Sequence, residues 1–266
     1  MPFRNGTALS WDHGDYIYAL LGARYEDSDR RLFYRYSISN NKWEGPLVET
    51  PHAQGAGDAL TWSGYDNKIY AFLGSNGHGG SIFASYNPQL NKWQTLRLPD
   101  GWGCTDDGAS LVWTGREYLY ALQGSDCDDE PSTNFAQFHI PTKEWIRRAP
   151  IPQGVDDGGS LLWIGDSLDE EQNYIYALAG ALDEDPGYNF YHYIISEDRW
   201  EQLEDIPCPI GWYNGNRLGL ASGQIYYWQG SPKTDRWQCQ NGDKGGKNFY
   251  KYEFVKGSQG CFGFGI

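Results

Sequence analysis

Residues 106–124 read Asp-Asp-Gly-Ala-Ser-Leu-Val-Trp-Thr-Gly-Arg-Glu-Tyr-Leu-Tyr-Ala-Leu-Gln-Gly. Two short runs of apolar, β-branched and aromatic residues flank a Thr-Gly turn, and this pattern predicts a β-hairpin. Similar segments occur at residues 6–22, 57–74 and 158–180, and a looser version occurs at residues 215–230. The chain is therefore predicted to be an array of similar units.

Each unit extends beyond its hairpin with further strand signals. A Trp at a regular spacing marks the first strand of four units: Trp11, Trp62, Trp113 and Trp163, with Leu220 in the fifth. Each second strand is followed by a Gly: Gly22, Gly74, Gly124, Gly180 and Gly230. A third strand begins at a Phe: Phe33, Phe83, Phe135, Phe190 and Phe249. A fourth strand carries another Trp in four units: Trp43, Trp93, Trp145 and Trp200.

Four strands in about fifty residues are typical of one β-propeller blade, because packing blades face to face covers both apolar sides of each sheet. We predict an all-β, single-domain, five-bladed β-propeller with four antiparallel strands per blade. The blades cover approximately residues 3–51, 52–100, 101–152, 153–207 and 208–266. Residues 260–266 are expected to supply the last strand. We expect residues 3–11 to pack beside the last blade and close the ring; an alternative closure, in which they complete its sheet, stays open.

The repeated motifs resemble those of the kelch-repeat family. They are Tyr-Ile-Tyr-Ala with its trailing Gly (residues 16–22), Phe-Tyr-Arg-Tyr (33–36) and Asn-Lys-Trp (41–43), each with counterparts in other units. One Gly stands where kelch repeats usually carry two. The resemblance implies that ligands bind on the face where the loop entering the first strand and the loop after the second strand open. The copper oxidases of this kind have more blades and a His and Tyr set that this chain lacks.

The charge balance restricts the partners. With 21 basic and 35 acidic residues the formal net charge is −14, so nucleic acid and anionic membrane surfaces are not expected partners. No apolar run approaches the roughly 18–20 residues that a membrane-spanning helix needs. We expect a monomer that binds a small polar ligand or a protein.

A polar residue precedes a repeated Gly at the entrance of several first strands. That Gly recurs as Gly6, Gly57, Gly108, Gly158 and Gly215, which predicts a positive φ or a close approach near the axis. The polar side chains before it are Arg4, Asn5, Asp106, Asp107, Asp156, Asp157, Tyr213 and Asn214. Such a ring can bind sugar hydroxyls or a hard cation such as calcium. It can equally be turn chemistry that recurs with the turn.

Aromatic residues outside the repeat pattern lie in loops on the same face. They are Trp102, Trp212, Tyr213 and Trp237. Aromatic rings beside carboxylates and amides suit a carbohydrate site and also a protein-binding hot spot. The alternative is that these rings pack as lids over the channel. The first functional hypothesis is therefore a ligand-binding module at the mouth of the central channel.

The second hypothesis is an enzyme in the same cavity, a lyase, isomerase or hydrolase. His52 and His78 lie in the two upper loops of blade two, Asp58 follows closely, and Tyr213 lies in blade five. A His titrates near neutrality, and a carboxylate can orient it for acid–base catalysis. The alternative is two solvent-exposed His residues on loops.

Four of the five cysteines occupy equivalent loops in two blades. The spacing predicts the disulfides Cys104–Cys127 and Cys208–Cys239, with Cys261 left over. If both form, we expect an oxidising setting such as the extracellular space; otherwise we expect the cytoplasm.

Overall fold

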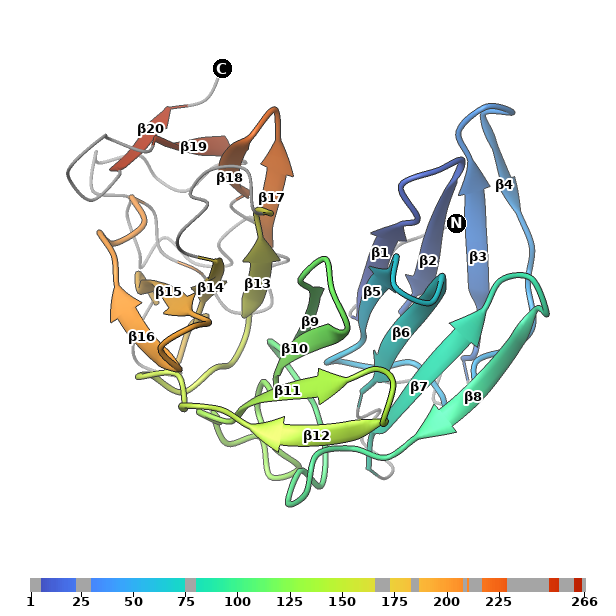
Figure 1. The fold of residues 1–266 in the computed structure, drawn as a ribbon, viewed down its shortest axis with the longest axis horizontal. Helices are drawn as coiled ribbons and strands as arrows, with labels where there is room; N and C mark the ends of the chain where they lie inside the picture. Colours follow the sequence, from blue (N-terminus) through green and yellow to red (C-terminus); the bar gives the residue numbers. More distant parts are fainter. Residues whose placement is uncertain are drawn as a thin grey trace.

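A computed structural model of the chain describes residues 6–22, 30–74, 80–165, 173–182, 187–207, 210, 217–228, 249–253 and 261–264. These residues form twenty β-strands in five four-stranded antiparallel sheets and contain no helix. Accordingly, none of the described segments is a helix long and apolar enough to cross a membrane. Figure 1 shows the five sheets arranged around a common centre, as blades of a β-propeller.

Each sheet takes its four strands from consecutive segments of the chain. Blade one contains β1 (Thr7–Trp11), β2 (Tyr16–Leu21), β3 (Phe33–Ser37) and β4 (Lys42–Glu44). Blade two contains β5 (Ala59–Ser63), β6 (Lys68–Leu73), β7 (Ile82–Asn87) and β8 (Lys92–Leu96). Blade three contains β9 (Ser110–Trp113), β10 (Tyr118–Leu122), β11 (Phe135–His139) and β12 (Glu144–Arg147).

The last two blades follow the same plan. Blade four contains β13 (Ser160–Trp163), β14 (Tyr174–Leu178), β15 (Phe190–Ile194) and β16 (Arg199–Gln202). Blade five contains β17 (Arg217–Ala221), β18 (Gln224–Trp228), β19 (Phe249–Glu253) and β20 (Cys261–Phe264). The predicted five-bladed, four-stranded architecture is confirmed. The final sheet is completed by β20, whereas β1 pairs with β2, so the N-terminal strand belongs to blade one.

The first strand of each blade is the innermost. In Figure 1 these strands follow one another near the centre, and β1 contacts β5, β5 contacts β9, β9 contacts β13, and β13 contacts β17. The polar entering loops of neighbouring blades are consequently brought together at one end of the innermost strands.

The core lies between adjacent blades, and one aromatic motif builds it repeatedly. Phe33 of β3 lies 4.9 Å from Tyr86 and 5.0 Å from Trp93 of blade two, measured between ring centroids. The same three-ring contact is formed by Phe83 with Phe138 and Trp145, and by Phe135 with Tyr193 and Trp200. Aromatic pairs at such distances contribute roughly 0.5–1.5 kcal/mol beyond the burial of their area. The recurring Phe, Tyr and Trp therefore join one blade to the next.

Blades one and five each present an aromatic ring on a less covered side. Trp11 in β1 is 48% exposed and Trp228 in β18 is 49% exposed. In contrast, the counterparts of Trp11 in blades two to four, Trp62, Trp113 and Trp163, are partly buried and pack against the core clusters. Packing is therefore densest where blades adjoin on both sides.

Candidate functional site

The repeated Gly before each first strand lets neighbouring entering loops touch. Gly57 and Gly108 have φ angles of +75° and +79°, which only Gly adopts readily. A Cβ atom on Gly57 would lie 2.5 Å from the carbonyl oxygen of Asp106, and one on Gly108 would overlap the carbonyl oxygen of Asp156. Both parts of the prediction, the positive φ and the close approach, are confirmed at these two positions.

A disulfide and backbone hydrogen bonds fix the entering loop of blade three. Cys104 and Cys127 form the predicted bridge, with their Cα atoms 5.2 Å apart. Ser125 from the loop after β10 donates its amide to the carbonyl oxygen of Asp107 at 2.9 Å and accepts from the amide of Asp106 at 3.2 Å. The Gln123 side chain donates to the carbonyl oxygen of Cys104 at 2.9 Å. Asp106 and Asp107 are thus held in place from both sides.

Five carboxyl groups from the entering loops of blades two, three and four form what we call the acidic cluster: Asp58, Asp106, Asp107, Asp156 and Asp157. Burial raises the pKa of Asp107 to about 7, with further contributions from the charges of Asp157, Asp106 and Asp156. Like charges held close together in a partly buried place disfavour ionisation. Asp107 therefore changes charge near neutral pH.

Asp58 extends the cluster into blade two and is only 2% exposed. Its Oδ1 accepts hydrogen bonds from the amides of Gly74 at 2.8 Å and Gly55 at 3.3 Å. Among the described residues, its buried Oδ2 has no hydrogen-bond partner. Burial raises the pKa of Asp58 well above its ordinary value, and the nearby charge of Asp106 adds to this. Burial therefore disfavours ionisation of Asp58, whereas the amide hydrogen bonds from Gly74 and Gly55 oppose this effect.

The raised pKa of Asp107 predicts that the free energy of unfolding depends on pH. The folded state holds this proton more tightly than the unfolded state, so the contribution of Asp107 to stability falls between about pH 4 and pH 7 and is level above that. We expect Asp107→Asn to be at least about 2 kcal/mol more stable than the wild type at pH 8 and nearly equal to it at pH 4. Urea unfolding at both pH values measures this difference. The exposed Glu204→Gln should show no such change, and an equal effect of both substitutions would contradict the assignment.

Two other predicted residues, Trp102 and His52, do not have the surroundings that their predicted roles require. Trp102 is 5% exposed and packs against Phe72 and Trp145, at centroid distances of 6.0 and 6.2 Å, so its ring is buried between blades two and three. It offers no exposed stacking surface. The ring nitrogen Nδ1 of His52 lies 2.9 Å from the carbonyl oxygen of Ala53. Because the bonded oxygen of Asp58 serves backbone amides, the predicted orientation of His52 by Asp58 is not formed.

The remaining predicted residues lie outside the described part of the chain. They are Arg4, Asn5, His78, Cys208, Trp212, Tyr213, Asn214, Trp237 and Cys239. Where the chain is described, no group of three or more His, Cys, Asp or Glu side chains is arranged to hold a metal ion.

Comparison with known proteins supports the fold alone. No family model matches the chain, so the resemblance to kelch repeats is not confirmed, and no curated protein sequence matches it either. A solved structure titled "Structure of YjhT" is similar, with a TM-score of 0.64 and 17% sequence identity. The similarity covers 94% of this chain and 80% of that chain. At this identity it shows a shared propeller architecture.

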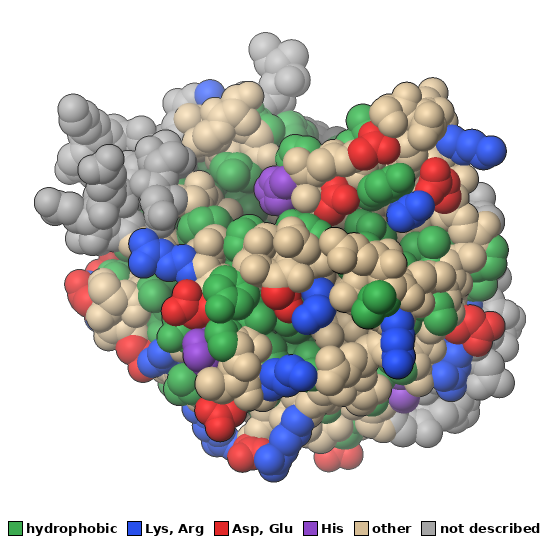
Figure 2. Space-filling model, turned by 45° about the vertical axis from the view of Figure 1, so that its right-hand side comes forward, with side chains coloured by type: hydrophobic (Ala, Val, Ile, Leu, Met, Phe, Trp, Pro, Cys, Tyr) green, Lys and Arg blue, Asp and Glu red, His purple; other side chains and the backbone are tan. Residues whose placement is uncertain are grey.

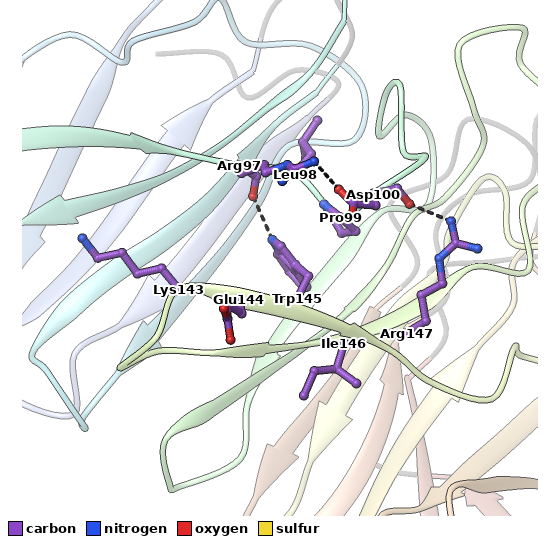
Figure 3. A pocket seen from close by; sticks show the side chains of 9 residues that line it. All are labelled: Arg97, Leu98, Pro99, Asp100, Lys143, Glu144, Trp145, Ile146 and Arg147. Atoms are coloured by element: carbon purple, nitrogen blue, oxygen red, sulfur yellow. Dashed lines mark hydrogen bonds and ion pairs between the residues drawn. The ribbon is translucent and has the colours of Figure 1, made fainter.

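A groove on the outer rim was not predicted from the sequence. It has a volume of about 490 Å³ and lies between the segment after β8 and the strand β12 (Figure 3). Basic and acidic side chains are intermixed over the face of the molecule shown in Figure 2, without one continuous patch of either sign. A signal for the groove was present in the sequence, because Lys143 stands where three other units have Asn41, Asn91 and Asp198.

Proposed function

We propose that this protein is a binding module that holds a neutral, hydroxyl-rich ligand of the carbohydrate class at the acidic cluster. The observation that carries the proposal is the position of Asp107, a carboxyl of pKa about 7 among the carboxyls of Asp106, Asp156 and Asp157. Ionised carboxylates accept hydrogen bonds and protonated ones also donate, so the cluster can pair with both sides of a hydroxyl group. An anionic ligand would meet repulsion there.

The location of the cluster supports the same function. Its loops belong to three neighbouring blades and touch through their backbones, so the carboxyl groups sit on rigid supports. A preformed site loses little conformational entropy when a ligand binds. The Cys104–Cys127 bridge supports an oxidising setting such as the extracellular space, where disulfides persist.

A direct binding experiment tests this proposal. A panel of mono- and oligosaccharides is titrated calorimetrically against the wild type, Asp107→Asn and Asp157→Asn, with the exposed Glu204→Gln as the matched control for charge. We expect a sugar whose affinity falls at least about tenfold in both cluster variants, equivalent to about 1.4 kcal/mol, and is unchanged in the control. A sugar that binds all four proteins equally would place the site elsewhere.

The second candidate is an enzyme that uses Asp107 as its general acid or base. A carboxyl with a pKa near the working pH suits proton transfer, and this observation favours Asp107 over the pair of His52 and Asp58. A lyase, isomerase or hydrolase acting on the same class of ligand would show turnover that Asp107→Asn removes. A sugar that binds and is recovered unchanged after prolonged incubation supports the binding module instead.

A further inference from the structure

The turn between the third and fourth strands has the same backbone geometry in several blades of this chain. Asn41, Asn91 and Asp198 occupy equivalent turn positions with φ angles of +51°, +47° and +51°. Each side chain also accepts a hydrogen bond from the third-strand Tyr of its own blade. The Tyr86 hydroxyl donates to Asn91 Oδ1 at 2.8 Å, and the Tyr193 hydroxyl donates to Asp198 Oδ1 at 2.6 Å.

Two of these turns also clamp the neighbouring blade. Asn91 Oδ1 accepts the amide of Val48 from blade one at 3.3 Å. Asp198 Oδ1 accepts the amide of Ala149 from blade three at 2.9 Å. A single short side chain therefore joins its own third strand to the segment leaving the preceding blade. These hydrogen bonds span the space between the outer strands of adjoining blades on the rim.

Blade three lacks both parts of the clamp. Its turn position is Lys143, with a φ of +60°, and its third-strand residue is Phe138 in place of Tyr. The Lys side chain has no acceptor atom and Phe has no hydroxyl group. A Lys in the left-handed region is also less favourable than an Asn or Asp, whose short polar side chains suit that conformation. The crevice between blades two and three is consequently without the Asn or Asp clamp.

The unclamped crevice is the groove of about 490 Å³. Lys143, Trp145 and Arg147 alternate along the chain, and in Figure 3 their side chains lie on the side of β12 that faces the groove, whereas Glu144 and Ile146 point away. Trp145 forms the centre and donates from Nε1 to the carbonyl oxygen of Arg97 at 2.8 Å. The groove therefore has an aromatic floor with a cation at either end.

The acidic group on the opposite wall is already paired. The carboxylate of Asp100 lies 2.5 Å from the guanidinium of Arg97, while Arg147 donates to the backbone oxygen of Asp100 at 2.8 Å. Among the described residues neither Lys143 nor Arg147 forms an ion pair, so these two cations can interact with a ligand. This local positive charge contrasts with the net charge of −14 of the whole chain.

We propose that this rim groove docks an extended acidic segment of a partner protein. An extended strand rises about 3.3 Å per residue, so Lys143 and Arg147 are separated by roughly 13 Å. A peptide with the pattern acidic–x–apolar–x–acidic matches this spacing, with its apolar side chain against Trp145 and its acidic side chains beside Lys143 and Arg147. The volume lies within the range of ligand sites, and the partner is selected by charge complementarity.

Introducing the missing clamp into blade three tests the proposal. Trp145 and its hydrogen-bond partner Arg97 stay in place, whereas Lys143 is replaced. The double variant Phe138→Tyr/Lys143→Asn installs the pair found in blade two, so it should fold with a melting temperature equal to or above that of the wild type. Random decapeptides displayed on phage are selected against the wild type. We expect enrichment of the pattern above, at least tenfold weaker binding of the selected peptides to the double variant, and weaker binding at higher salt.

Two outcomes would overturn the proposal. One is the selection of no peptides, or of peptides without acidic enrichment. The other is unchanged binding of acidic peptides to a folded Phe138→Tyr/Lys143→Asn variant. Glu204→Gln is the matched control, since this exposed residue of blade four does not line the groove, and the affinity of this variant for the peptides should equal that of the wild type. The experiment is independent of carbohydrate binding, because the acidic cluster is unaltered in every variant.

Discussion

Replacing Gly108 with alanine is expected to lower the free energy of unfolding by at least about 3 kcal/mol. The new Cβ would overlap the carbonyl oxygen of Asp156 in the adjoining blade, and the residue has a φ of +79°. Strain at a positive φ and overpacking each cost roughly 1–3 kcal/mol, and here they act together at a contact between two backbones. Urea unfolding followed by Trp fluorescence measures the loss.

Two other glycines separate these contributions. Gly223 has a φ of +71° but open space around it, so Gly223→Ala reports the cost of the backbone conformation alone. Gly219 lies in β17, has no positive φ and also has open space, so Gly219→Ala should be nearly neutral. A loss in Gly108→Ala no greater than that in Gly223→Ala would show that the entering loops do not touch as described.

Removing the disulfide by the double substitution Cys104→Ser/Cys127→Ser is expected to cost about 3 kcal/mol. The bridge closes a loop across a sequence separation of 23 residues, and a loop of this size constrains the unfolded chain by about that amount. The double substitution is preferred to a reductant, because a reductant would also act on the other cysteines. Chemical denaturation of the oxidised wild type and the variant gives the comparison.

The disulfide also supports the acidic cluster, so its removal has a second expected effect. Asp106 and Asp107 are held by the loop that contains Cys127, and loosening that loop should weaken ligand binding more than it weakens the rest of the fold. A variant that keeps wild-type stability and affinity would contradict both statements. A variant that loses stability but keeps full affinity would confine the role of the bridge to folding.

The fold was predictable because the residue types that a propeller requires recur at fixed positions of each repeat. Strand-forming aromatics recur where blades stack, as in Phe33, Phe83 and Phe135, and Gly recurs where entering loops meet. Local pattern and global packing therefore agree in blades one to four. The last strand was predicted correctly as well, because residues 260–266 were assigned to it and β20 pairs with β19.

The candidate site was predicted only in part. The acidic residues and the Cys104–Cys127 bridge follow from loop positions that the repeat fixes. The direction of a single loop side chain does not follow from position, and Trp102 accordingly points into the core beside Phe72. His52 and Asp58 are close in sequence, which suggested that Asp58 orients His52. In the structure Asp58 instead accepts hydrogen bonds from the amides of Gly55 and Gly74. The aligned repeats show that Lys143 replaces the Asn or Asp of other units. The consequence for the groove became clear only from the hydrogen bonds that Asn91 and Asp198 form in the structure.

The uneven covering of the blades has a consequence for how the molecule opens in its native state. Trp11 and Trp228 lie partly exposed on blades one and five, whereas blades two to four are covered on both sides. Regions with fewer buried contacts open at lower free energy and exchange their amide protons sooner. Protection measured by hydrogen–deuterium exchange should therefore rise from β2 to β6 and β10 and fall again towards β18. The two terminal blades would then open first. The acidic cluster, which lies on blades two to four, would belong to the part of the molecule that opens last.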